Sequence, residues 1–518
     1  MEWLRVAPYT SLQSHTRFLL TLRSKEDHYH SLILFRLANT NGLTIPQPDA
    51  QPASSTEDDV LSGRLDNMNL GNDHQLYAME SSCPHLGADM SHAEIEECED
   101  SYVAVCPWHR YDFDLKTGKS ETGLRACTYD VQLRSEEGHD QVVYVETPSN
   151  GTEWRLVELR PVSEEFADPP PEASTFQSRL PLPHVPQATP VDEPMVPETN
   201  PPTTLMQWAV LILNTANPTL KVQRTRHAVH LFRTGKLVSI GHKASNAPTP
   251  PEVPPREEKV LQNTVDPAKV RNRKNRAVML HALANIEQWA IDLAWDIMAR
   301  FGPMHPDLPP AFFSDFAKVA EDEAKHFSLL TSRLHETSPS TPYGSLPVHA
   351  SLWASASTTS QSLLSRLAII HLVHEARGLD VNPGTIEKFR KAGDMESVKV
   401  MEIIHADEVT HVTAGHRWFV WLCERDGGTK VGGMQAKLDP VTVFREEVRR
   451  GWRGDIKGPF NVEAREKAGM GREFYEGLRG ELGIHEQKGR IVEDKHQDEK
   501  NPQAEPEVRL EYENAVNV

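Results

Sequence analysis

The spacing of hydrophobic positions changes near the middle of the chain. In the first part, short apolar stretches alternate with turn residues, a pattern typical of β-strands. These stretches are residues 18–22, 31–37, 75–80, 102–105 and 141–146. From residue 205, apolar positions recur at helical spacing, which predicts long helices. The predicted helices are residues 277–301, 311–334, 356–377, 395–423 and 440–451. We therefore predict a multidomain protein in which a small all-β domain precedes an all-α domain.

Changes in composition predict where these domains begin and end. Residues 161–202 hold 12 of the chain's 38 prolines, and proline can neither continue a helix nor pair in a central strand. The charged, apolar-poor end of the chain is expected to be disordered. The predicted segments are a β domain at 1–147 with a mobile polar insertion at 41–72, a proline-rich linker at 148–204, a helical domain at 205–483 and a disordered tail at 484–518.

Two short Cys–His motifs carry the clearest chemistry of the first part. Cys83 and His85 lie in the sequence Cys-Pro-His-Leu-Gly, and Cys106 and His109 lie in Cys-Pro-Trp-His after a gap of eighteen residues. In a Rieske [2Fe–2S] cluster, two thiolates hold one iron and two imidazoles hold the other. Zinc is the alternative, because Cys and His also bind zinc. The matched order of Cys before His, between strand-like stretches, favours the iron–sulfur cluster.

Residues 83–87 and 106–118 resemble those of soluble Rieske-type ferredoxins, and the resemblance covers roughly residues 1–147. It implies a [2Fe–2S] cluster bound by the two Cys and two His residues of these motifs. Respiratory Rieske proteins add a disulfide between the two loops. The corresponding positions here are Ala88 and Trp108, so the resemblance is to the ferredoxin type. Such a cluster passes one electron and performs no chemistry on a substrate.

The remaining composition bears on compartment and partners. Outside the two motifs the only cysteines are Cys98, Cys127 and Cys423, which is typical of a reducing compartment rather than of a disulfide framework. The N-terminus lacks a signal peptide's apolar stretch, and no run approaches the roughly 20 apolar residues that span a bilayer. We expect a soluble, cytoplasmic protein with no membrane partner.

Charge weighs against nucleic acid as a partner. The chain of 518 residues has a net charge of −19, whereas nucleic-acid binding needs a basic face. One segment, residues 269–276, has five basic residues in eight. Its simpler interpretation is a solvated turn before a helix.

Carboxylates and imidazoles recur on the predicted helices at the spacing of a di-iron site. Helical bundles of this kind use one Glu from each of two helices and a Glu-x-x-His from each of the other two. Residues i and i+3 share a helix face, and four carboxylates balance the charge of two Fe(II) ions. The chain offers the set in the order Glu287, Glu323 with His326, Glu375, and Glu408 with His411.

The Glu-x-x-His pattern alone is weak evidence, because it also occurs at residues 136–139, 402–405 and 493–496. Asp322 and Asp407 distinguish the two chosen motifs, since an Asp beside a ligand is suited to hold a metal-bound imidazole. Further histidines could reach the metal, although each is more simply a helix-face or core residue. These are His281, His371, His374 and His405.

The helical region, from about residue 205 to residue 470, resembles the ferritin-like family known as domain of unknown function 455. The matching stretches are residues 285–292, 319–330, 343–353, 375–383, 394–418 and 458–469. The resemblance implies a ferritin-like four-helix bundle that binds metal. It implies no reaction, although the family's distant similarity to a tRNA-hydroxylating di-iron enzyme suggests substrate hydroxylation.

Together the two sites predict an iron-dependent oxidoreductase. The Rieske cluster would pass single electrons to a carboxylate-bridged di-iron or Mn/Fe centre that activates O2 to oxidise a small molecule. Multicomponent di-iron monooxygenases use separate Rieske ferredoxins in this way, and fusion would make delivery intramolecular. No Gly-x-Gly-x-x-Gly occurs in a strand–helix setting, so we expect an external NAD(P)H-dependent reductase as a partner.

Two alternatives stay open at this point. The protein could be a non-enzymatic iron-binding or redox-sensing protein in which the Rieske domain serves as sensor. It could also be a hydroxylase that modifies tRNA or protein, although the acidic balance weighs against RNA.

Overall fold

The computed structural model describes two compact units. The first comprises residues 1–84, 93–106 and 110–163, and the second comprises residues 85–92, 107–109 and 164–518. Placement is described for residues 2–13, 15–38, 74–98, 101–136, 139–162, 193–266, 275–426, 430–431, 434–435 and 438–482. The expected insertion, the expected tail and most of the expected linker lie outside these described residues.

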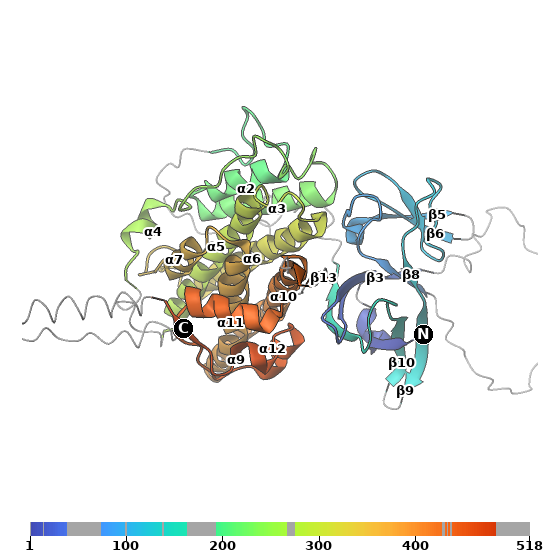
Figure 1. Cartoon of the computed structure of the whole chain (residues 1–518). Coiled ribbons are helices and arrows are strands. Elements are labelled where there is room, and N and C mark those ends of the chain that lie inside the picture. Colours follow the sequence, from blue (N-terminus) through green and yellow to red (C-terminus); the bar gives the residue numbers. More distant parts are fainter. Residues whose placement is uncertain are drawn as a thin grey trace, which may run out of the picture. The chain divides into compact units, whose positions relative to one another are not determined.

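The first unit is built from antiparallel strands (Figure 1). They are β1 (Trp3–Pro8), β2 (Arg17–Arg23), β3 (Tyr29–Ala38), β4 (His74–Glu80), β5 (Glu94–Cys98), β6 (Ser101–Val105), β7 (Asp112–Asp114), β8 (Thr128–Tyr129), β9 (Val131–Glu136), β10 (His139–Glu146) and β11 (Arg155–Pro161). They pair in the orders β11-β2-β3-β4-β8, β1-β10-β9 and β5-β6-β7. The predicted all-β character of this region is confirmed.

Alternating apolar residues build the core of this unit. Leu20 of β2 pairs with Leu32 of β3, and Phe18 pairs with Leu34 two residues along. All four side chains are buried, because residues two apart on a strand share one face of the sheet. β11 pairs with β2 and buries Val157. The sheet therefore continues past residue 147, where the linker was expected to begin.

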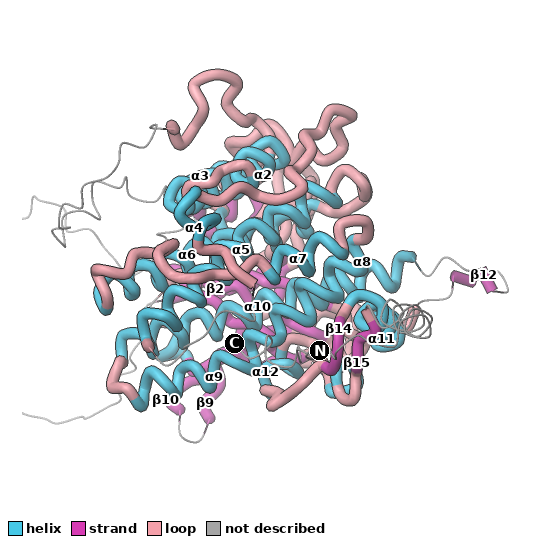
Figure 2. The backbone as a smooth tube through the Cα atoms, turned by 90° about the vertical axis from the view of Figure 1, so that its left-hand side faces the viewer, coloured by secondary structure: helices cyan, strands magenta, loops and turns pink. Residues whose placement is uncertain are grey.

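The second unit is mostly helical. Its helices are α2 (Leu205–Leu213), α3 (Pro218–Arg233), α4 (Glu258–Gln262), α5 (Arg276–Phe301), α6 (Pro310–Thr337), α7 (Ser351–Thr358), α8 (Leu363–Arg366), η6 (Leu367–His374), α9 (Glu375–Lys391), α10 (Met395–Asp426), α11 (Pro440–Gly451), α12 (Val462–Lys467) and α13 (Arg472–Tyr475). Two short strand pairs accompany them, β12 (Lys430–Val431) with β13 (Met434–Gln435) and β14 (Arg453–Asp455) with β15 (Arg479–Glu481). The latter pair lies beside α11 (Figure 2).

Four of the five predicted helices match the structure closely, and the third does not. The prediction of one helix at 356–377 is wrong, because α7 ends at Thr358 and a new helical run begins at Leu363. The polar sequence between them, Thr-Ser-Gln-Ser, competes for backbone hydrogen bonds and favours a break. The new run continues to Lys391 although Pro383 lies inside it. It also contains a π-helix, η6, directly before Glu375.

The helices that carry the predicted metal ligands pack against one another. α5 packs along α6, α9 packs along α10, and α10 also contacts α6 and η6 (Figure 1). α10 approaches η6 closely at Gly415, where a Cβ atom would lie 2.6 Å from the carbonyl oxygen of His371. Only glycine allows that approach without a shift of the backbone.

No helix among the described residues combines the length and the apolar character needed to cross a membrane.

Candidate metal centres

The two Cys–His motifs occupy loops at the ends of strands in the first part of the chain. The loop with Cys83 and His85 follows β4, and the loop with Cys106 and His109 connects β6 to β7. Both thiols are buried, with 2% and 0% exposure. The imidazole rings of His85 and His109 lie with their centroids 4.8 Å apart, and His109 is exposed. Buried sulfur ligands beside a more exposed pair of imidazoles suit a cluster that exchanges electrons through its histidine edge.

Backbone hydrogen bonds shape the second loop. The amide of Cys106 donates to the carbonyl of Tyr111 at 2.7 Å, and the amide of Arg110 donates to the carbonyl of Cys106 at 2.9 Å. Gly118 follows in the turn after β7 with a φ of +70°, and a Cβ atom there would lie 2.0 Å from the carbonyl oxygen of Ala126. This turn, Lys116-Thr117-Gly118, therefore requires its glycine.

In the helical unit, the six predicted carboxylate and imidazole residues come together as two overlapping groups. Every member of a group offers a ligand atom within 4.8 Å of the others. The residues come from α5, α6, the start of α9 and α10. One group is Glu287, Glu323, His326 and Glu408, and the other is Glu323, Glu375, Glu408 and His411.

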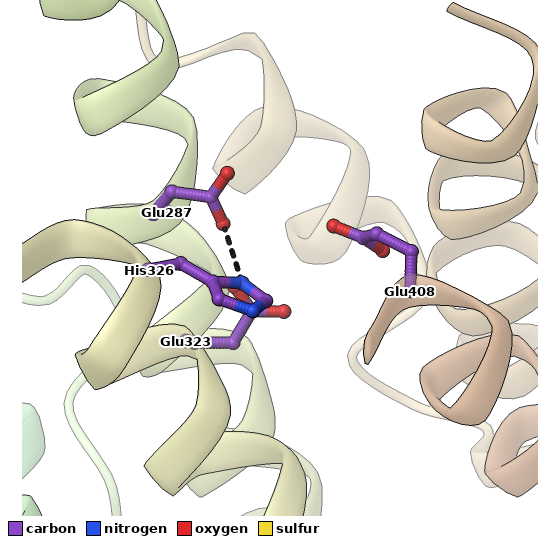
Figure 3. Close-up of side chains that lie close together, drawn as sticks. All are labelled: Glu287, Glu323, His326 and Glu408. Atoms are coloured by element: carbon purple, nitrogen blue, oxygen red, sulfur yellow. Dashed lines mark ion pairs between the residues drawn. The ribbon is translucent and has the colours of Figure 1, made fainter. Parts of the chain in front are cut away.

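Glu323 lies between the two imidazoles. Its Oε1 is 3.0 Å from Nδ1 of His411, and its Oε2 is 3.4 Å from Nδ1 of His326. Nδ1 of His326 is also 3.5 Å from Oε2 of Glu287, the pair marked in Figure 3, where Glu408 projects toward them from another helix. Glu323 and Glu408 belong to both groups, so they could contribute ligand atoms to either one.

Burial and charge act strongly on the four carboxylates. Burial and the charge of Glu323 raise the pKa of Glu287 to about 8 and the pKa of Glu375 to about 7. Burial and the charge of Glu375 raise the pKa of Glu408 well above its ordinary value. Burial opposes ionisation of Glu323, but the charge of His411 lowers its pKa below the ordinary value. Crowded carboxylates in a core need positive charge beside them, and divalent metal ions supply it.

The Asp before each Glu-x-x-His ligand holds the histidine of the opposite helix. Nε2 of His326 donates to Oδ2 of Asp407 at 3.0 Å, and Nε2 of His411 donates to Oδ2 of Asp322 at 3.4 Å. These pairs cross between α6 and α10. Nδ1 of each ring faces the carboxylates and is the atom that would hold a metal ion, which is the arrangement of a metal-ligating histidine with a supporting carboxylate.

The four further histidines considered from the sequence lie outside both groups of described residues. Nε2 of His281 accepts the backbone amide of Gly344 at 2.9 Å, so this ring has a structural partner. Burial lowers the pKa of His281 and His374 to about 4. Burial and the charge of Arg366 lower the pKa of His371 to about 3, which favours its neutral form. His405 is half-buried.

Lys325 was missed by the sequence reasoning. Its Nζ lies 3.0 Å from Oδ1 of Asp322 and 2.5 Å from Oδ2 of Asp407. No sequence signal marks this role of Lys325, because the side chain of a lysine within a helix is ordinarily exposed to solvent.

Several buried polar atoms of the two groups make no hydrogen bond within the described residues. They are both carboxylate oxygens of Glu323, Oε2 of Glu408, and Nδ1 of His326 and of His411. An unsatisfied buried polar atom costs free energy, and a bound cation would satisfy these atoms. Mixed carboxylate and imidazole donors suit iron or manganese. The residues present therefore fit a pair of divalent metal ions.

Comparison with known proteins identifies both regions. The Rieske [2Fe–2S] domain model matches residues 57–128, which include the two Cys–His loops, so this region is a Rieske domain with a role in iron–sulfur electron transfer. A solved structure assigned as the small subunit of an NADH-dependent nitrite reductase from Mycobacterium tuberculosis is 13% identical, covers 29% of this chain and 96% of that chain, and has a TM-score of 0.19. A superposition of that quality carries no argument about fold or activity.

A relative and a second family model also match the chain. An uncharacterised protein of Haemophilus influenzae is 35% identical over 197 residues, which are 38% of this chain. The match spans only 64% of that relative's length. The family model described as Protein of unknown function (DUF455) matches residues 214–476, half of the chain. The chain therefore belongs to the DUF455 family and carries its Rieske domain ahead of the family region.

Proposed function

We propose that this protein is an oxidoreductase in which the Rieske cluster passes single electrons to a di-iron, or Mn/Fe, centre in a ferritin-like helical bundle. The observation that carries the proposal is the pair of overlapping ligand groups joined by Glu323 and Glu408. When bound, a carboxylate-bridged metal pair supplies two-electron activation of O2. The reaction class is oxidation of a small molecule, such as hydroxylation, which consumes O2, two electrons and two protons and places one oxygen atom in the product and the other in water.

Six side chains of the helical unit would hold the two metal ions. Glu287 and His326 would hold one metal ion, and Glu375 and His411 would hold the other. Glu323 and Glu408 would bridge the two ions. This division follows the membership of the two groups, and four carboxylates would balance the charge of two divalent ions.

The Rieske domain would act as the electron supply. Its two buried thiolates and two more exposed imidazoles suit transfer of one electron at a time. Two such transfers would be needed for each O2. The electrons would come from an external NAD(P)H-dependent reductase, because the sequence offers no dinucleotide-binding motif of its own. The expected setting is the cytoplasm.

Reoxidation of the cluster by O2 tests this proposal. The full chain, loaded with iron, is reduced without oxygen and then mixed with O2 while the visible absorbance of the cluster is followed. We expect the Glu408→Ala variant to reoxidise at least about 10-fold more slowly than the wild type, since loss of a bridging ligand disables the metal pair. Equal rates in the two proteins would contradict the proposal.

Glu402→Ala is the matched control. Glu402 lies on the same helix and in its own Glu-x-x-His pattern, but it is exposed and pairs with Arg390 at 3.2 Å. Its variant should reoxidise like the wild type. Metal and sulfide analysis of the wild type should give four irons and two sulfides per chain, two irons from each site. Two irons alone would mean that the helical unit holds none.

A further inference from the structure

The two metal-ligating motifs of the helical unit are related by sequence and by position. α6 presents Asp-Glu-Ala-Lys-His from Asp322 to His326, and α10 presents Asp-Glu-Val-Thr-His from Asp407 to His411. Each Asp accepts a hydrogen bond from the His of the other motif. The exchange is reciprocal, as in an arrangement with approximate twofold symmetry.

Lys325 breaks this symmetry. The equivalent position on α10 is Thr410, so only α6 offers an ammonium group at this place in the motif. Its Nζ contacts Oδ1 of Asp322 on its own helix at 3.0 Å and Oδ2 of Asp407 on the facing helix at 2.5 Å. A single ammonium group therefore contacts both of the carboxylates that hold the two histidines.

We propose that Lys325 is a positioning residue that orients both imidazoles toward the metal pair by holding Asp322 and Asp407 together. The inference rests on the metal centre of the proposed function. Lys325 acts through the two aspartates, and the aspartates act on His326 and His411. One side chain thereby couples the geometry of two metal positions.

The burial of the network gives this coupling its strength. The side chains of Asp322 and His411 are 1% exposed, that of His326 is 0% exposed and that of Asp407 is 13% exposed. Charge interactions in such surroundings are screened much less than those at the surface. Without the ammonium group, two carboxylates that contact the same point would face each other, and like charges in a core repel strongly. Each Asp would move, and the ring that it holds would turn with it.

The effect should differ from that of changing either aspartate. Asp407 accepts a hydrogen bond from His326, and Asp322 accepts one from His411. Replacing either aspartate by Asn should therefore weaken the binding of chiefly one metal ion. A substitution of Lys325 should weaken the binding of both ions together, although Lys325 itself belongs to neither ligand group.

Titration with Mn(II) tests this difference without an activity assay. The full chain carrying its oxidised cluster is titrated, and free Mn(II) is counted from its EPR signal, while the spectrum of the bound pair reports coupling between the ions. We expect Lys325→Met to raise both dissociation constants by about 10- to 100-fold, the usual effect of losing a partner that orients metal ligands. Asp407→Asn and Asp322→Asn should each raise mainly one. Lys325→Arg should restore both constants and the spectrum of the coupled pair.

Lys399→Met is the matched control. Lys399 pairs with Glu396 at 2.8 Å over the same three-residue helical spacing, on an exposed face of α10. It should bind Mn(II) like the wild type. If Lys325→Met does not fold, Lys325→Gln replaces it, and the same rise in both constants is expected because the charge is lost.

The outcomes separate two failures. A wild type that binds no Mn(II) would contradict the metal centre itself, and this inference with it. A wild type that binds two ions, with unchanged constants after the Lys325 substitution, would overturn only the positioning role. So would a failure of Lys325→Arg to restore binding in a folded protein, or a loss of thermal stability with both constants unchanged.

Discussion

The two candidate metal regions of this protein are built in different ways. The candidate ligands of the Rieske cluster lie on two short loops, with Cys83 and His85 in one and Cys106 and His109 in the other. The carboxylate groups instead draw on helices from Glu287 to His411. The first region depends on local turns between neighbouring strands. The second exists only when distant helices pack in the correct register.

The ion pairs of the two units also differ in how deeply they are buried. The β unit has exposed pairs such as Lys25 with Glu153, whose side chains are 64% and 67% exposed, and partly buried ones such as Arg23 with Asp27, at 7% and 38%. In the helical unit, Asp292 on α5 is fully buried and contacts two buried cations, Lys221 and Arg256. Exposed pairs contribute roughly 0–1 kcal/mol, whereas breaking a buried pair typically costs about 3–5 kcal/mol. The helical unit therefore contains a buried network of charges around Asp292.

The strongest test of this contrast removes a cluster ligand. We expect Cys106→Ser to lose the [2Fe–2S] cluster completely, because a thiolate ligand to one iron is gone. Mn(II) binding in the helical unit should be unchanged, since its ligands lie on other elements. The measurement is visible absorbance for the cluster and EPR of free Mn(II) for the helices.

Cys127→Ser provides the control for that variant. Cys127 is exposed and lies outside both loops, so its substitution should leave both signals intact. Loss of Mn(II) binding in Cys106→Ser would contradict the independence of the two regions.

The same contrast explains what the sequence could predict. The cluster ligands were readable because each pair lies within four residues, and the strands around them alternate visibly. Four of the six candidate ligands on the helices were readable because Glu-x-x-His marks one helix face. Glu287 and Glu375 were readable as the single Glu that each of the other two helices of such a bundle contributes. The structure brings all six together.

The features that the sequence did not predict depend on the register between helices. The crossing of Asp322 to His411 and of Asp407 to His326 requires knowledge of which turns of α6 and α10 face each other. The contact of Lys325 with both aspartates has the same origin. The π-helix before Glu375 also follows from tertiary packing, and helix propensity carries no signal for it.

A second test breaks the charged core of the helical unit. Asp292→Ala leaves Lys221 and Arg256 buried with their shared partner gone. We expect the free energy of unfolding of the helical unit to fall by about 3–5 kcal/mol. Urea unfolding followed by far-UV ellipticity measures the helices, and the visible absorbance of the cluster reports the two Cys–His loops in the same sample.

The cluster signal should keep its wild-type urea midpoint in that variant. Asp307→Ala is the control, because Asp307 is 57% exposed and pairs with Arg425 at the surface. It should cost roughly 0–1 kcal/mol. An equal shift of the cluster and helix midpoints in Asp292→Ala would mean that the two units unfold together, which would contradict the contrast between them.

The smallest expected effect concerns pH and sharpens the contrast further. Burial lowers the pKa of Lys221 from 10.5 to about 8, against the opposing charge of Asp292. Between these two values the unfolded chain keeps a proton that the folded chain has released, so the free energy of unfolding rises with pH. Below about pH 8 both states hold the proton, and this contribution is absent. From about pH 7.5 to about pH 9.5 the rise should be about 2 kcal/mol.

Lys221→Met removes the titrating group while Asp292 keeps Arg256 at 2.6 Å. Urea unfolding at the two pH values should therefore show no rise in the free energy of unfolding for the helices of this variant, in contrast to the wild type. The cluster absorbance should respond to pH equally in both proteins, because the β unit has no part in this ion pair. A rise of the same size in the variant would show that Lys221 is not its source. A change confined to the wild-type helices would tie the stability of the helical unit to the buried charge of Lys221 on α3. Its partner Asp292 lies on α5, the helix that also carries Glu287.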